Sequence, residues 1–155
     1  SVVISYILGL FYTVVRRKTM VQPICTDLFL LSRPARPVLP EDEPLARDLL
    51  DTLQAHREGC VGMAANMIGK PLRVIAVDCG GELLLMRNPE ILKAEGAYEA
   101  EEGCLSLEGT RRTTRYQKIK VRYQNEAFQT RVKTFRDFPA QIIQHECDHL
   151  AGKLI

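Results

Sequence analysis

The feature that most restricts the fold is a pair of histidines near the end of the chain, His145 and His149, in the pattern H-E-x-x-H. On an α-helix these positions lie about 40° apart around the axis and one turn apart along it, so both imidazoles can reach one metal ion. Glu146 lies on the adjoining side, where it can take a proton from a water at that ion without being a ligand. The motif therefore predicts a metal-binding helix over about residues 139–151, with Asp137 as its N-cap.

The alternative is a surface helix that carries two incidental histidines. It is disfavoured because the chain has only three histidines and two of them occupy this motif. Cys147 is displaced by about 200° from His145, so we expect it to face away from the metal as a buried apolar residue. For Gln144 and Asp148 two interpretations stand equally: either residue holds the second ring nitrogen of a histidine, or it is a solvated helix residue.

Two imidazoles do not complete a catalytic metal site, which usually has three protein ligands and one position for water. In the common zinc proteases the third ligand follows the second histidine, but here residues 150–155 offer no usual ligand. The third ligand is therefore expected upstream. Cys104 is the natural candidate, because a thiolate binds Zn²⁺ or Fe²⁺ well and Gly103 lets the backbone pass close to the ion. On local sequence alone we would interpret Cys104 as a buried small residue. Because the two histidines lack a third ligand, we interpret it as a metal ligand instead.

Length and composition predict one ordinary globular domain. The chain has 155 residues, 46% of them hydrophobic and 26% charged, which is enough to form a core. Residues 20–155 carry 18 cations and 19 anions. Because this part of the chain has no excess of positive charge to neutralise phosphates, we do not expect a nucleic-acid partner. The five cysteines form no C-x-x-C pair and are odd in number, which favours reduced thiols and a cytoplasmic protein.

The first residues differ from the rest of the chain. Residues 2–15 are almost wholly apolar and are followed by three cations, Arg16, Arg17 and Lys18. As a helix, this run would be about 21 Å long, short of the roughly 30 Å of a bilayer, and it lacks the features of a signal peptide. We therefore expect no membrane partner. Residues 1–19 are interpreted as an N-terminal extension that is not part of the fold, and 20–155 as a single domain; the alternative is an added helix or strand packed on that domain.

The remaining pattern predicts an α+β fold. Leucines at helical spacing indicate a helix over about 45–57. Residues 73–79 and 82–86 are strand-like, and Gly80-Gly81 between them suits a two-residue hairpin turn. Apolar and polar residues then alternate over 118–123 and 128–134, as in half-exposed antiparallel strands. The order helix, strands, helix is typical of an α+β domain.

Three stretches of the chain resemble motifs of the peptide deformylase family. Residues 102–106 read E-G-C-L-S, as the family motif does, and residues 144–149 read Q-H-E-C-D-H, similar to the family's Q-H-E-x-D-H. Residues 60–67 read C-V-G-M-A-A-N-M, which is an imperfect match to G-x-G-L-A-A-x-Q. The motifs occur in the family's order, so the resemblance covers most of the chain after Met20.

The resemblance implies antiparallel strands wrapped around a central C-terminal helix that carries H-E-x-x-H. It implies removal of the formyl group from the N-terminal formylmethionine of new polypeptides. One divalent metal ion is implied for each chain, Fe²⁺ in the cell with Zn²⁺ or Ni²⁺ as replacements. A transient association with the ribosome is a further expectation. The implied roles are metal ligation by Cys104, His145 and His149, acid/base catalysis by Glu146, oxyanion stabilisation by the backbone N–H of Leu105, and substrate binding by Gly62 and Val61.

The third motif departs from the family at two positions. Met67 stands where the family has a glutamine whose amide stabilises the oxyanion, and a thioether cannot donate a hydrogen bond. Deformylase activity is therefore expected to be reduced. Asn66, one position earlier, has an amide that could donate the hydrogen bond, but its side chain is shorter than that of glutamine. Cys60 replaces the first glycine, where backbone must approach a ligand closely. The basic stretch at 109–115 is open to two interpretations, in which Arg111 or Arg112 meets a peptide or the stretch is a solvated face; the second is preferred.

Four functions fit these residues. The first is a deformylase weakened by Met67, and the second is a hydrolase acting on another small N-acyl amine. A third is a catalytically idle metal-binding homologue, which would have no reason to keep Glu146. The fourth, a zinc endopeptidase, is weakened by the absence of a ligand after His149. The preferred interpretation is the metal-dependent deformylase.

Overall fold

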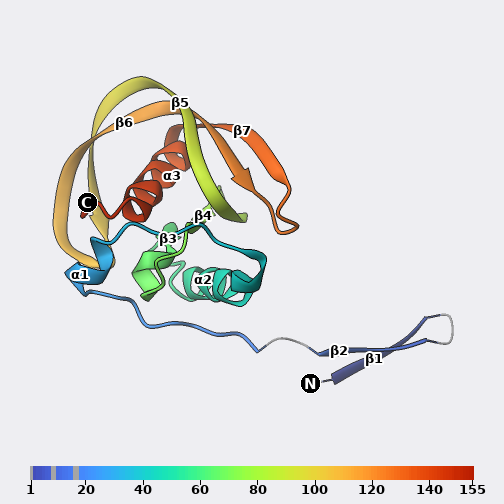
Figure 1. Ribbon diagram of the computed structural model, residues 1–155. Helices are drawn as coiled ribbons and strands as arrows, with labels where there is room; N and C mark the ends of the chain where they lie inside the picture. Colours follow the sequence, from blue (N-terminus) through green and yellow to red (C-terminus); the bar gives the residue numbers. More distant parts are fainter. Residues whose placement is uncertain (1, 8–9, 16–17) are drawn as a thin grey trace.

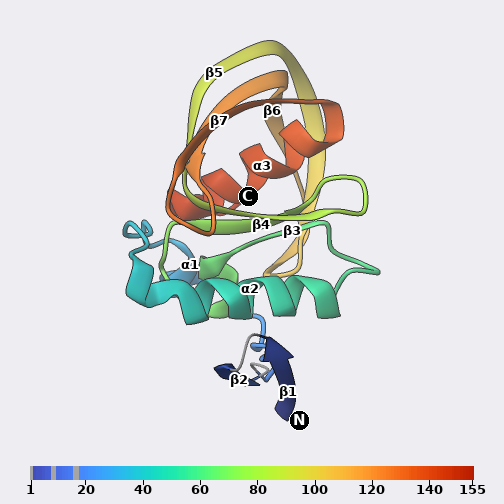
Figure 2. The ribbon, with the colours of Figure 1, turned by 90° about the vertical axis from the view of Figure 1, so that its right-hand side faces the viewer.

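The computed structural model describes residues 2–7, 10–15 and 18–155. Its main element is an antiparallel sheet of five strands in the order β3-β4-β5-β6-β7, wrapped around the last helix, α3 (Figures 1 and 2). This is the predicted α+β architecture. The strands are β3 (Gly62–Ala64), β4 (Val74–Asp78), β5 (Leu83–Cys104), β6 (Leu107–Gln124) and β7 (Thr130–Arg136), and the helix is α3 (Asp137–Leu150).

The wrapping is done by one long hairpin, β5 and β6. Its register shifts at three places in β5, between Arg87 and Glu90, between Ile91 and Lys93, and between Gly103 and Cys104. Such irregularities bend a strand and increase its twist, which lets the hairpin curve over α3 (Figure 2). The hairpin closes at residues 105–106, so Cys104 lies at its tip, paired with Leu107.

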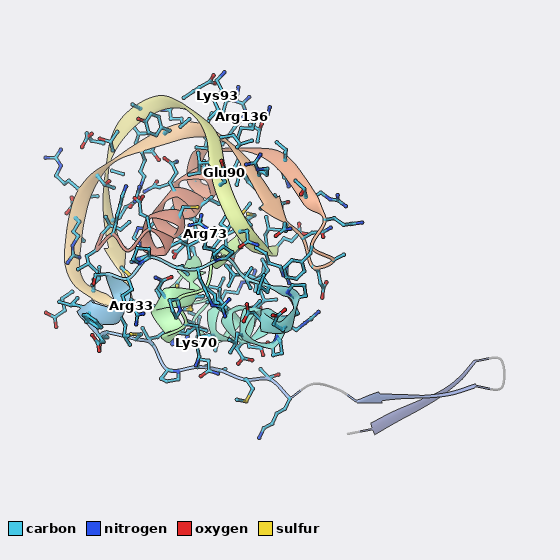
Figure 3. All side chains as sticks on the ribbon, in the orientation of Figure 1. Arg33, Lys70, Arg73, Glu90, Lys93 and Arg136 are labelled. Carbon is cyan, nitrogen blue, oxygen red and sulfur yellow. The ribbon has the colours of Figure 1, made fainter. Side chains whose placement is uncertain are left out.

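Alternation along β6 and β7 separates a buried face from an exposed one, as predicted. Ile119, Val121 and Tyr123 are buried, whereas Lys120 and Arg122 between them are exposed. On the outer side of the sheet, away from α3, charged side chains such as Lys93 and Arg136 project outward (Figure 3). The strand that was expected to begin at Phe128 begins at Thr130, because Phe128 lies in the turn with φ +58°.

The helix α3 packs against the sheet over most of its length. Ala140, Ile143 and Leu150 are fully buried in a cluster that includes Val121 and Phe135. The helix begins two residues earlier than predicted, and Asp137 is its first residue rather than its N-cap. Arg136 occupies the N-cap position without a side-chain hydrogen bond.

A second cluster lies under the sheet, between β3, β4 and the helix α2 (Glu43–Ala55). Ala46, Leu49 and Leu53 of α2 are fully buried there. The helix was predicted over 45–57, so it begins and ends two residues earlier. Two short 3-10 helices, η1 (Pro40–Asp42) and η2 (Ala65–Ile68), and the helical turn α1 (Leu28–Leu31) complete this side.

The turn between β4 and β5 is the predicted two-residue hairpin. Gly80 and Gly81 have φ of +75° and +102°, a conformation that side chains oppose. The Cys79 N–H donates to the Glu82 carbonyl at 2.8 Å and closes the turn.

The first strands stand apart from this sheet. β1 (Val2–Ile7) and β2 (Leu10–Val15) pair with each other in a separate antiparallel sheet (Figure 1). The chain then runs along α2, where the Gln22 N–H donates to Thr52 Oγ1 at 2.9 Å. That residues 1–19 are an extension outside the fold stays a prediction. Among the described helices, none has the length and apolar character needed to cross a membrane.

A close contact between β3 and α3 gives a first test of the packing. A Cβ on Gly62 would lie 2.5 Å from Ile142 Cγ2 and 2.9 Å from Glu146 Oε1. We therefore expect Gly62→Ala to push α3 away from β3 and to lower the free energy of unfolding by about 1–3 kcal/mol. Urea denaturation measures this change. Gly59→Ala is the matched control, because a Cβ there meets nothing within 4 Å; equal stability of the two variants would contradict the packing.

Candidate metal centre

Three of the predicted site residues converge on one point. Cys104 Sγ lies 3.3 Å from His149 Nε2, which lies 3.1 Å from His145 Nε2, and all three ligand atoms lie within 4.8 Å of one another. The two histidines come from adjacent turns of α3, and the thiol comes from the tip of the β5–β6 hairpin. The curvature of that hairpin therefore brings a distant cysteine to the helix.

The chemistry of these three side chains fits a divalent transition metal. His145 Nδ1 is hydrogen-bonded to Glu102 Oε1 at 3.0 Å, which leaves Nε2 to face the thiol and the second imidazole. The Ser106 N–H points to Cys104 Sγ at 3.4 Å and supports negative charge on the sulfur. One thiolate and two imidazoles form a set that Zn²⁺ and Fe²⁺ accept, and three protein ligands are the usual number in a catalytic site.

Glu102 holds the second ring nitrogen of His145, and that of His149 has no hydrogen-bond partner among the described residues, so neither Gln144 nor Asp148 orients a histidine. Neither is a fully solvated helix residue, because Gln144 is buried and Asp148 is half-buried. The Gln144 side chain instead bonds the backbone N–H and carbonyl of Tyr116. Asp148 accepts a hydrogen bond from Arg115 at 2.6 Å. Both residues face β6, so they fasten α3 to the sheet rather than orient a ligand.

Arg115 is, with Glu102, a residue whose role the sequence interpretation missed. Its guanidinium is buried and donates hydrogen bonds to Glu102 at 2.7 Å and to Asp148 at 2.6 Å. The basic stretch at 109–115 is part of strand β6. Arg112 is exposed, as the preferred interpretation expected. The apolar alternation that begins at residue 118 does not extend to Arg115, so the sequence carried no local signal for its burial.

Burial and these contacts shift the pKa values of the site in opposite directions. Burial favours a protonated Glu102, but hydrogen bonds from His145, Arg115 and Gln141 outweigh it and lower its pKa to about 2. Burial also opposes charge on His145, yet its hydrogen bonds to Cys104 and Glu102 raise its pKa to about 10. Burial and the neighbouring His145 lower the pKa of His149 to about 4. These contacts therefore favour the charged forms of Glu102 and His145 and the neutral form of His149.

Glu146 lies beside the three ligand atoms but is not among them. Its side chain is buried, one oxygen (Oε2) has no hydrogen-bond partner among the described residues, and the Ala64 N–H interacts with the carboxylate. Burial raises its pKa to about 7, where a carboxyl group can both accept and return a proton. Cys147 packs against the apolar core on the other side of α3, as predicted.

A cavity of about 490 Å³ opens onto this group. Cys104, His145 and Glu146 line it, together with three further residues of the predicted site, Val61, Gly62 and Leu105. The side chains of Val61 and Leu105 are 40% and 43% exposed, so they form its rim. Gly62 lies deeper, and its close approach is to α3.

The wall of the cavity also contains both departures from the motif, Cys60 and Met67. Met67 is almost fully buried and belongs to the second apolar cluster. Asn66, its neighbour in η2, donates through its amide to the Arg33 carbonyl at 3.2 Å. That contact holds the amide of Asn66 away from the role of the missing glutamine.

Comparison with known sequences gives one family. The family model described as polypeptide deformylase matches residues 22–155. A peptide deformylase of Clostridium beijerinckii is 45% identical over 136 residues, which is 88% of this chain and 100% of that protein. One from Aquifex aeolicus is 42% identical over 72% of this chain and 69% of its own length.

Solved structures give the same family. The actinonin-bound class I type b peptide deformylase of Acinetobacter baumannii aligns with a TM-score of 0.78 and 33% identity, covering 88% of this chain and 96% of that one. The peptide deformylase of Thermus thermophilus aligns with a TM-score of 0.76 and 36% identity, covering 86% and 83%.

The buried guanidinium of Arg115 gives a second test. In Arg115→Met, Glu102 and Asp148 lose their buried cation, so we expect the free energy of unfolding to fall by about 3–5 kcal/mol. Arg112→Met is the matched control on the same strand; its exposed side chain should change stability by less than about 0.5 kcal/mol. Urea denaturation of the metal-free proteins measures both. A loss below 1 kcal/mol in Arg115→Met would show that the cation is dispensable.

Proposed function

The chain belongs to the peptide deformylase family, and on that premise we propose that the cavity beside Cys104, His145 and His149 is its active site. The chain is a metal-dependent hydrolase that removes the formyl group from nascent peptides. The observation that carries the location of the site is the convergence of three ligand atoms next to Glu146, in a cavity with an exposed rim.

A divalent ion held by the three ligands would polarise the formyl oxygen and make a water acidic enough to attack near neutral pH. We propose that the Glu146 carboxylate takes the proton of the attacking water and then delivers it to the departing nitrogen. The C–N bond breaks, and formate and a free amine leave. The high pKa of the buried Glu146 supports both transfers.

The same proposal assigns oxyanion stabilisation to Leu105 and substrate binding to Val61 and Gly62. The backbone N–H of Leu105 donates to the developing oxyanion, while Val61 and Gly62 line the path of the peptide. Their place on the cavity supports these roles. A structure of the Acinetobacter baumannii peptide deformylase, a member of the same family, contains bound Met-Ala-Ser, which supports a peptide as the occupant of this cavity.

Ferrous iron is the metal proposed for the cell, with Zn²⁺ or Ni²⁺ as replacements, because a thiolate and two imidazoles accept all three. The five cysteines are unpaired, which supports a reducing compartment and hence the cytoplasm. Because the substrate is a new polypeptide, transient association with the ribosome is part of the proposal.

An idle metal-binding homologue is a weaker explanation of Glu146. A buried carboxylate with an unpartnered oxygen is costly, and a protein that only binds metal has no use for it. Another N-acyl amine as the substrate is not favoured, since the relatives that cover most of the chain are peptide deformylases.

Replacing Glu146 tests the enzyme directly. Glu146→Gln keeps the shape of the side chain but removes the proton acceptor, so formate release from N-formyl-Met-Ala-Ser should fall by about 10²–10⁴-fold. Metal content should stay at the parent level, because Glu146 is not a ligand. A formate assay and elemental analysis of the same preparation measure the two quantities. Parental turnover in a metal-loaded Glu146→Gln protein would refute the assignment.

Position 67 tests whether the missing amide limits the reaction. Met67→Gln restores a donor on the cavity wall, so deformylation should rise, by up to about 10²–10³-fold if the full contribution of one oxyanion donor is recovered. Met67→Leu, which has no donor, is the control and should stay near the parental rate. The readout is kcat/KM for the formylated tripeptide. If folded Met67→Gln protein is no faster than the parent, position 67 does not limit transition-state stabilisation.

A further inference from the structure

Two polar side chains outside the ligand set form a hydrogen-bonded line that ends at the metal centre. The Tyr98 hydroxyl on β5 donates to Gln141 Oε1 at 3.1 Å, and Gln141 Nε2 donates to Glu102 Oε2 at 2.9 Å. The other oxygen of Glu102 bonds His145 Nδ1. The line therefore runs from a half-buried tyrosine through an amide and a carboxylate to a ligand ring.

Each group in this line has its orientation fixed by its neighbour. The Glu102 carboxylate only accepts hydrogen bonds, so Gln141 must turn its NH₂ group toward it. The amide oxygen then faces Tyr98, whose hydroxyl supplies the donor that this oxygen needs. Rotating the amide by half a turn would set its oxygen against the carboxylate and leave the tyrosine hydroxyl facing an NH₂ group. Tyr98 thus favours the one orientation in which Gln141 supports Glu102.

Gln141 occupies a position that an apolar residue would otherwise suit. It lies one helical turn before His145 and lines the cavity, beside apolar Phe138 and Ile142. Arg115 holds Glu102 from strand β6, and Gln141 holds the same carboxylate from α3. Because its carboxylate is held from two elements, Glu102 has little freedom to rotate away from the imidazole.

We propose that Gln141 and Tyr98 are positioning residues for His145. By fixing Glu102 they keep the ring tautomer that carries its proton on Nδ1 and presents Nε2 to the metal. This inference rests on the proposed metal centre. Its consequence is that metal affinity depends on two residues that touch neither the metal nor a ligand atom. Partners of this kind typically change metal affinity by about 10–100-fold when removed.

The test measures metal binding by the full chain, stripped of metal and titrated with Zn²⁺ or Co²⁺ against a chelator. Gln141→Met keeps an unbranched side chain of similar length and should weaken binding about 10–100-fold. Tyr98→Phe should weaken it about two- to tenfold, the range of one neutral hydrogen bond. The double variant should bind no more weakly than Gln141→Met alone, because Tyr98 acts through Gln141. The visible absorption bands of the Co²⁺ protein should shift in both single variants.

Tyr116→Phe is the matched control. Tyr116 lies on the neighbouring strand β6 and meets α3 through its backbone, so the loss of its hydroxyl should leave both affinity and spectrum unchanged. Thermal denaturation of the metal-free proteins shows whether each variant is folded. If Gln141→Met is unfolded, the proposal is tested with Tyr98→Phe alone. Parental affinity and Co²⁺ spectrum in folded Tyr98→Phe and Gln141→Met proteins would overturn the proposal. A parent that binds neither ion would instead overturn the metal centre itself.

Discussion

The buried carboxylate of Glu102 is the interaction on which the metal centre depends. It accepts hydrogen bonds from the His145 ring, the Arg115 guanidinium and the Gln141 amide, which come from two elements, α3 and β6. Burying an unpaired carboxylate would cost several kcal/mol, so these donors are required for the fold as well as for the ligand. Because Glu102 lies two residues before Cys104, one strand end supplies both a proposed ligand and the support of another.

The sequence identified the three side chains that converge in the structure better than it identified their hydrogen-bond partners, for a physical reason. His145 and His149 are related by a helical period, which the chain displays directly, and Cys104 followed from the absence of a ligand after them. The partners depend on which strands meet α3 and in what register. Glu102 pairs across the hairpin with Arg111, yet its buried cation is Arg115, four residues further along β6. Strand pairing interrupted by three irregularities cannot be read from alternation alone.

The same limit applies to the cavity wall. Side-chain chemistry was enough to predict that Met67 donates no hydrogen bond. Whether Asn66 replaces that donor depended on the direction of its amide, which the short helix η2 sets by turning it toward the Arg33 carbonyl. The outline of the fold was predictable, since the α+β class and the β4–β5 turn follow from local patterns. The bounds of β5 were not, because its exposed middle carries few apolar residues to mark a strand.

The centre is assembled where two periodicities meet. Over the last residues of β5 burial alternates, so that Tyr98, Glu102 and Cys104 lie on the side of α3 while 99, 101 and 103 are exposed. Along α3, Gln141, His145 and His149 recur every four residues and form one stripe. The strand side chains bond this stripe in order: Tyr98 to Gln141, Glu102 to Gln141 and His145, and Cys104 to His149. A shift of one residue in β5 would turn all three side chains away from the helix. The register of the hairpin therefore determines the geometry of the proposed metal site.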